Sequence, residues 1–178
     1  FRRVLFRSPI YLADKYGFNV KEIGLFAWVP YVGAAIGSIA GGAYAGKLID
    51  SGKTINRARK QTISIGGAVM FLGLVSVLLF GDAPLNFVII VAFVLFGFQF
   101  AIGNVQTLPS DFFSGKSVGS LAGLGGSVGV FSVIIMNFLV PKITAGGNYS
   151  PVFFMIALFV PMGVLSIYLL ARNIKQLS

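Results

Sequence analysis

The segment Gly46–Lys60, GKLIDSGKTINRARK, decides the fold because it is a short basic stretch between two long apolar ones. Five of the chain's 14 basic residues lie in it, against a single acid, Asp50. The flanking runs, 24–45 and 61–81, carry no charged residue. Lys and Arg are retained on the cytoplasmic side when membrane proteins insert. The segment therefore predicts a cytoplasmic turn between two membrane-spanning helices.

The composition indicates a membrane protein. Of 178 residues, 56% are hydrophobic and only 11% are charged, whereas a soluble domain has roughly 25% charged residues. The net charge of +9 lies in loops, so we interpret it as a topology signal rather than a nucleic-acid surface. Without Cys or His, zinc sites, Ser-His-Asp triads and Cys-His pairs are excluded. We expect no metal, no cofactor and no enzymatic activity.

Uncharged runs in this chain are long enough to cross a bilayer. A hydrocarbon core of ~30 Å needs about 20 helical residues, and backbone groups in lipid must be paired within the segment. The sequence predicts an all-α polytopic bundle with five full spans, 23–46, 61–81, 83–110, 117–141 and 143–171. With the basic segment inside, basic residues are concentrated on the inner side, and the C-terminus is expected in the cytoplasm.

The first eight residues, FRRVLFRS, look foreign to the rest of the chain. The hexapeptide 3–8, RVLFRS, resembles the translation of a sequencing adapter, and we expect residues 1–8 to be non-native. The alternative is a native basic flank before a helix. Residues 9–178 then form one transmembrane domain, in which Pro9–Gly17 has the character of the end of a further helix.

Small residues recur every four positions in the first full span. Gly33, Gly37, Gly41 and Ala45 form one row, and a second row is offset from it by one residue. Such spacing places small residues on one helix face and allows close approach of a neighbouring helix. We expect structural packing here, with movement of this contact during transport as the alternative. The fourth span repeats the pattern in its glycine-rich stretch 119–129.

Polar residues at membrane depth are concentrated in the third span, at Gln99, Asn104, Gln106 and Thr107, with Ser127 in the fourth. Amides and hydroxyls in hydrocarbon face protein or a water-filled path. Two interpretations stay open, hydrogen bonding between helices and contact with a polar substrate. No span carries a charge in its interior, although a proton-coupled transporter of an anion needs buried ionisable groups.

The chain resembles the C-terminal six-helix half of the major facilitator superfamily, and within it the anion:cation symporter family of sugar-acid transporters. Gly46 and Asp50 match the superfamily's G-x-x-x-D pattern, and Asn56–Lys60 matches the family's N-R-A-R-K ending. The resemblance is also carried by Pro9–Leu12, Gly17-Phe18, Thr107–Asp111, Lys116–Ser120 and Gly123–Gly126.

The resemblance implies alternating access between two six-helix halves, with substrate bound near the midplane. It implies gating or conformational roles for Gly46, Asp50, Arg57, Arg59 and Asp111. It also implies that Gln106, Thr107 and Ser127 face the substrate, with Asn104 and Gln99 as further candidates. The family's proton-coupling acids and anion-binding Arg belong to the N-terminal half, which the chain lacks.

These inferences predict half of a symporter that takes up an organic anion, such as a hexuronate or another sugar acid, with protons. The expected location is the inner membrane of a bacterium. Its partners would be the substrate, protons, the lipid bilayer and the missing half. Two alternatives remain: an efflux pump of the same superfamily for apolar or cationic compounds, and a membrane scaffold protein without transport activity.

Overall fold

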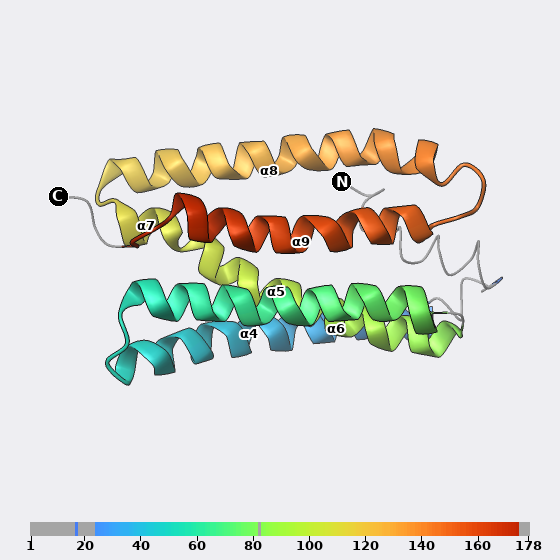
Figure 1. Ribbon diagram of the computed structural model, residues 1–178, viewed down its shortest axis with the longest axis horizontal. Coiled ribbons are helices and arrows are strands. Elements are labelled where there is room, and N and C mark those ends of the chain that lie inside the picture. Colours follow the sequence, from blue (N-terminus) through green and yellow to red (C-terminus); the bar gives the residue numbers. More distant parts are fainter. Residues whose placement is uncertain (1–16, 18–23, 82, 175–178) are drawn as a thin grey trace.

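The computed structural model describes Gly17, residues 24–81 and residues 83–174 of the chain. Residues 1–8 and most of Pro9–Gly17 lie outside the described part, so the expectations for them stay predictions. Every regular element that the structure describes is a helix (Figure 1). The helices are α4 (Val29–Asp50), α5 (Ile55–Phe80), α6 (Pro84–Gln106), α7 (Leu108–Phe112), α8 (Lys116–Ile143) and α9 (Ser150–Leu170).

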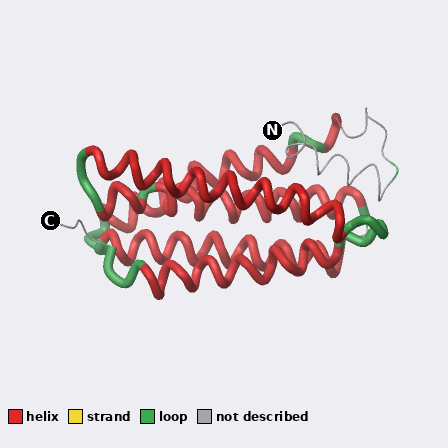
Figure 2. Tube along the Cα trace, turned by 90° about the horizontal axis from the view of Figure 1, so that it is seen from above, coloured by secondary structure: helices red, strands yellow, loops and turns green. Residues whose placement is uncertain are grey.

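The helices run lengthwise beside one another, with connecting loops at the two ends of the bundle (Figure 2). Five helical stretches in the described part are long and apolar enough to cross a membrane. Four of them are α4, α5, α8 and α9, with α4 extended at its start, and the fifth joins α6 to α7. The expected class, a polytopic transmembrane helix bundle, is confirmed.

The basic segment Gly46–Lys60 is mostly helical, which corrects the expectation of a loop across its whole length. Helix α4 continues to Asp50 and α5 begins at Ile55, so only residues 51–54 connect them. The turn is formed at Gly52, whose φ of 85° favours glycine. The Thr54 hydroxyl then accepts a hydrogen bond from the Arg57 backbone N–H and caps α5. The basic side chains thus extend from helical turns at one end of the bundle, here called the basic end.

The glycine row of α4 packs directly against α6. A Cβ built on Gly33 would lie 2.5 Å from the carbonyl oxygen of Ala92, and at Gly37 and Gly41 the α6 backbone is closer still. Contacts of this kind require residues without a side chain, as the four-residue spacing predicts. Gly42, in the offset row, has no atom within 4 Å of such a Cβ. The first row therefore forms the α4–α6 seam and the second faces away from it.

The apolar core lies between α5, α6 and α9. Leu74 of α5, Val94 of α6 and Ala157 of α9 form one buried cluster. A second cluster is formed by Val77 with Phe87 and Val88, one to two turns further from the basic end. Helix α8 contributes no buried side chain to the described core. The bundle is therefore packed together over α4, α5, α6 and α9, whereas α8 has no buried residue in its described part.

Candidate functional site

An ion pair at the basic end connects helices that are distant in sequence. Arg59, in the second turn of α5, donates from Nε to Oδ2 of Asp111 in α7 at 2.8 Å. A second bond runs from its Nη2 to Oδ1 of the same carboxylate at 3.4 Å. The side chains are 17% and 11% exposed, so protein rather than water surrounds much of the pair. Arginine's planar fork suits this two-bond geometry.

Asn104 extends this ion pair into the α4–α6 seam. Arg59 donates from Nη1 to Oδ1 of Asn104 at 2.9 Å. The Asn104 Nδ2 lies 3.3 Å from the carbonyl oxygens of both Gly41 and Phe100. Asn104 is only 2% exposed, and both ends of its amide are paired with protein. We call Arg59, Asp111 and Asn104 the basic-end network; it joins α4, α5, α6 and α7.

Of the five expected gating residues, the structure therefore brings Arg59 and Asp111 together and leaves the other three apart. Asp50, at the last position of α4, is exposed and forms no ion pair with any described residue. Arg57 is exposed on the first turn of α5, and Gly46 is half-buried one turn before Asp50. The sequence pattern identified Arg59 and Asp111 as candidates but did not predict that they contact each other. They are 52 residues apart, and the sequence does not show how their helices lie against one another.

The substrate-contact candidates of α6 lie on two different faces. Gln99 is half-buried and Gln106 is exposed, and neither side chain forms a hydrogen bond within the described chain. Gly103 lies between them on the same face, exposed and with no atom within 4 Å of a Cβ built on it. Asn104 faces the seam instead. The structure therefore leaves one strip of α6 uncovered, and its two amides are available to a ligand.

The two hydroxyl candidates are paired within their own helical segments. Thr107 Oγ1 donates to the carbonyl oxygen of Asn104 at 2.9 Å, where α6 ends. Ser127 Oγ donates to the carbonyl oxygen of Gly123 at 2.9 Å and is exposed on α8. Each hydroxyl oxygen retains lone pairs that can accept a further bond. Among the described residues no group of three or more His, Cys, Asp or Glu side chains gathers as a metal site would require.

These features define a class of protein. A bundle with five apolar helices of spanning length, and basic residues concentrated at one end, is a multi-pass membrane protein. Amides on an uncovered helix face within such a bundle are the kind of group that contacts a polar solute.

The chain is similar to transporters of organic anions, most of them sugar acids. The chain is 30% identical over 167 residues to the hexuronate transporter of Escherichia coli K12, covering 93% of this chain and 38% of the relative. It is 25% identical over 174 residues to the D-galactonate transporter of Escherichia coli O6:H1, covering 96% and 39%. It is 38% identical over 64 residues to the galacturonate transporter of Dickeya chrysanthemi, covering 35% and 18%.

The two longer matches cover most of this chain, which agrees with its resemblance to half of a major facilitator sugar-acid transporter. The chain spans a little over a third of the length of these relatives. No family model matches it.

Proposed function

We propose that this chain is the C-terminal half of a secondary transporter that takes up an organic anion, such as a hexuronate or another sugar acid, together with protons. The observation that carries the proposal is the similarity to sugar-acid transporters over nearly the whole chain. In a transporter built from two halves, substrate binds near the midplane where the halves meet. The absent N-terminal half would then supply the other wall of the site.

The proposed orientation places the basic end in the cytoplasm of a bacterium, with the chain in the inner membrane. The five basic residues of the segment Gly46–Lys60, together with Lys116 at the start of α8 and Arg172 after α9, belong to that end. The opposite end has Lys142 in the last turn of α8, and the proposed topology adds Lys15 and Lys21 to that side. This asymmetry follows the rule that basic residues stay inside.

The uncovered strip of α6 supports a role in recognising substrate hydroxyls. Gln99 and Gln106 present neutral donors and acceptors, which match the hydroxyl groups of a sugar acid. Thr107, directly after α6, and Ser127, on α8, would add hydroxyl oxygens. A carboxylate also needs a positive partner, and none lies in the uncharged runs 23–46, 61–81, 83–110, 117–141 and 143–171. The proposal therefore assigns the anion-binding and proton-carrying groups to the other half.

The test is uptake of labelled glucuronate and galacturonate by cells expressing the full-length transporter that contains this chain. Gln106→Ala and Thr107→Ala should each raise the KM while the amount of protein in the membrane stays constant. Ser76→Ala is the matched control, because Ser76 is half-buried on α5, away from the α6 strip, and its hydroxyl donates to the carbonyl oxygen of Leu72 in its own helix. Wild-type kinetics in both α6 variants would remove these residues from the site.

Two further results bear on the proposal itself. The reading frame upstream of Pro9 should encode about six more spans with a buried Arg and acids. Absence of sugar-acid uptake by the intact transporter, with export of apolar or cationic compounds instead, would overturn the proposed direction and substrate class.

A further inference from the structure

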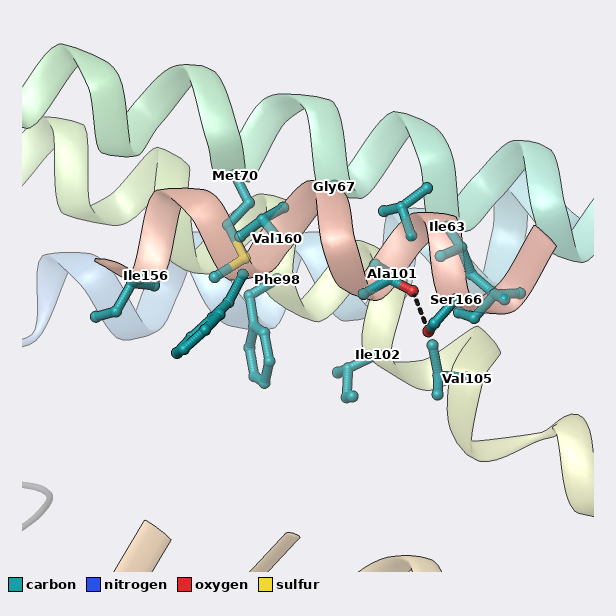
Figure 3. Close-up of a pocket in the computed structure, with 14 residues that line it drawn as sticks. Ile63, Gly67, Met70, Phe98, Ala101, Ile102, Val105, Ile156, Val160 and Ser166 are labelled. Carbon is teal, nitrogen blue, oxygen red and sulfur yellow. Dashed lines mark hydrogen bonds between the residues drawn. The ribbon is translucent and has the colours of Figure 1, made fainter. Parts of the chain in front are cut away.

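An apolar groove runs along the bundle between α5, α6 and α9 (Figure 3). Its volume is about 430 Å³. Phe98 and Ile102 of α6 point to its open side, away from α5. The hydroxyl of Ser166, a polar group in the lining, donates to the Gly163 carbonyl oxygen at 2.7 Å. The groove therefore offers an apolar surface whose hydroxyl is already paired.

The groove is about as long as one membrane leaflet is thick. On α9 it extends from Ile156 to Ile167, which corresponds to about 16 Å at a rise of 1.5 Å per residue. The hydrocarbon core is ~30 Å thick, so the groove has about half that length, and its α5 and α6 residues lie toward the basic end of their helices. Apolar space of this size in close-packed surroundings is filled rather than left empty. A single acyl chain matches both the direction and the chemistry of the groove.

Positive charge lies at the end of the groove nearest the basic end. Lys60 precedes the groove residue Ile63 by one turn of α5, and its Nζ donates to the backbone carbonyl of Arg172 at 2.9 Å. The same ammonium lies 5.1 Å from the centroid of the Tyr168 ring, next in sequence to the groove residue Ile167. Lys60 is thus held across the ends of α5 and α9.

Two cations at this end of the groove, Lys60 and Arg172, have no anionic partner in the described part of the chain. Arg59 is neutralised by Asp111, but Lys60 and the exposed Arg172 form no ion pair with any described residue. A basic pocket between membrane helices at the cytoplasmic surface is the type of site that binds anionic lipid headgroups.

From this arrangement we propose that the groove binds an anionic phospholipid, with one acyl chain along α9 and the phosphate at Lys60 and Arg172. Helix α8 is the other candidate to cover the groove, since none of its described side chains is buried. However, α8 contains no acid and begins with Lys116 at the same end. It therefore offers no negative charge to Lys60 and Arg172, whereas a phospholipid brings one.

The first experiment measures the thermal stability of the purified full-length transporter in detergent, with added phosphatidylglycerol or phosphatidylcholine of identical chains. Phosphatidylglycerol should raise the Tm by several degrees and phosphatidylcholine by much less. The double variant Lys60→Gln/Arg172→Gln should lose most of the difference between the lipids. Lys142→Gln, which removes a basic residue at the opposite end, should retain it. Equal shifts with both lipids, or an unchanged difference in the double variant, would overturn the headgroup site.

The second experiment fills the groove. Gly163 lines it and has no atom within 4 Å of a Cβ built on it, so Gly163→Leu adds volume there without a backbone clash. Mass spectrometry of the purified protein should show less co-purified phosphatidylglycerol than in the wild type. Gly123→Leu, at an equally open glycine of α8, should leave that amount unchanged.

Further outcomes separate the lipid from other occupants. A Tm rise with glycerol phosphate alone, equal to that with phosphatidylglycerol, would show a free-phosphate site and contradict the role of the groove. If α8 covers the groove, Gly163→Leu should lower the Tm in lipid-free detergent and phosphatidylglycerol should have no special effect. These experiments use no transport measurement, so their failure leaves the proposed transport function untouched.

Discussion

Arg59 and Asp111 are joined by a hydrogen-bonded ion pair, Nε to Oδ2 at 2.8 Å, across 52 residues of sequence. The pair connects the start of α5 to α7, directly after α6 ends at Gln106. Through Asn104 it is continuous with the Gly41 backbone of α4. Four helices are thus connected at the basic end, three of them directly by the Arg59 side chain and α4 through Asn104.

Replacing either member of the pair should destabilise the bundle. Hydrogen bonds to charged groups contribute about 1.5–3 kcal/mol, and both side chains are mostly covered. Arg59→Ala and Asp111→Ala should each lower the free energy of unfolding by about 2 kcal/mol. The double variant should cost less than the sum of the two, because the second change removes a charge already without its partner.

A double-mutant cycle based on unfolding of the purified transporter measures this coupling. Arg57→Ala is the control, since Arg57 is exposed and its side chain forms no hydrogen bond or ion pair in the described chain. Strict additivity of the two single effects would contradict an energetic role for the pair.

Asn104→Ala should be costly although it removes a neutral side chain. The change leaves one Arg59 N–H without its partner and removes the Asn104 bond to the Gly41 carbonyl, at a position that is only 2% exposed. An unpaired buried polar group costs about 1–3 kcal/mol. Gln106→Ala, two residues later on an exposed face, should leave the Tm nearly unchanged. Equal Tm values for the two variants would show that the buried amide contributes nothing to stability.

The two glycine rows of α4 should respond oppositely to alanine. At Gly37 a methyl group would collide with the Phe96 backbone, whereas at Gly42 it would meet open space. Gly37→Ala should therefore cost about 1–3 kcal/mol through overpacking. Gly42→Ala should be neutral or stabilising by up to about 1 kcal/mol, the difference in helix propensity. Thermal unfolding checks both; a tolerated Gly37→Ala would mean that α4 and α6 separate more readily than their close packing implies.

Asp50→Asn should lower the maximal transport rate more than it changes the KM. Asp50 is exposed at the C-terminal end of α4, where a negative charge is unfavourable to its own helix. We therefore expect the Asp50 carboxylate to act through a contact with a neighbouring helix end during the transport cycle. Initial-rate uptake across a range of substrate concentrations separates the two parameters. A wild-type maximal rate would contradict the gating role, and Lys53→Gln, in the adjacent turn, controls for loss of charge alone.

Much of the architecture follows from the sequence because lipid permits few solutions. A run of about 20 uncharged residues can satisfy its backbone in hydrocarbon only as a helix, and this consideration predicted the five spans. The spacing of Gly33, Gly37 and Gly41 predicted a close helix contact. The basic segment predicted the turn that joins the first two full spans. It did not predict where α4 ends, because Asp50 and Lys47 are compatible with both helix and loop.

Tertiary structure alone decided which polar groups are paired and which are free. Gln99, Asn104 and Gln106 are similar amides within two turns of α6, and their sequence positions do not show which face meets α4. The α4–α6 register places Asn104 against Gly41 and Arg59, and leaves Gln106 uncovered. The contact of Lys60 with Tyr168 and Arg172, more than 100 residues away, likewise depends on how α9 lies on α5. Hydropathy determines that a helix crosses the membrane, whereas its rotation and its partners are set by side-chain packing.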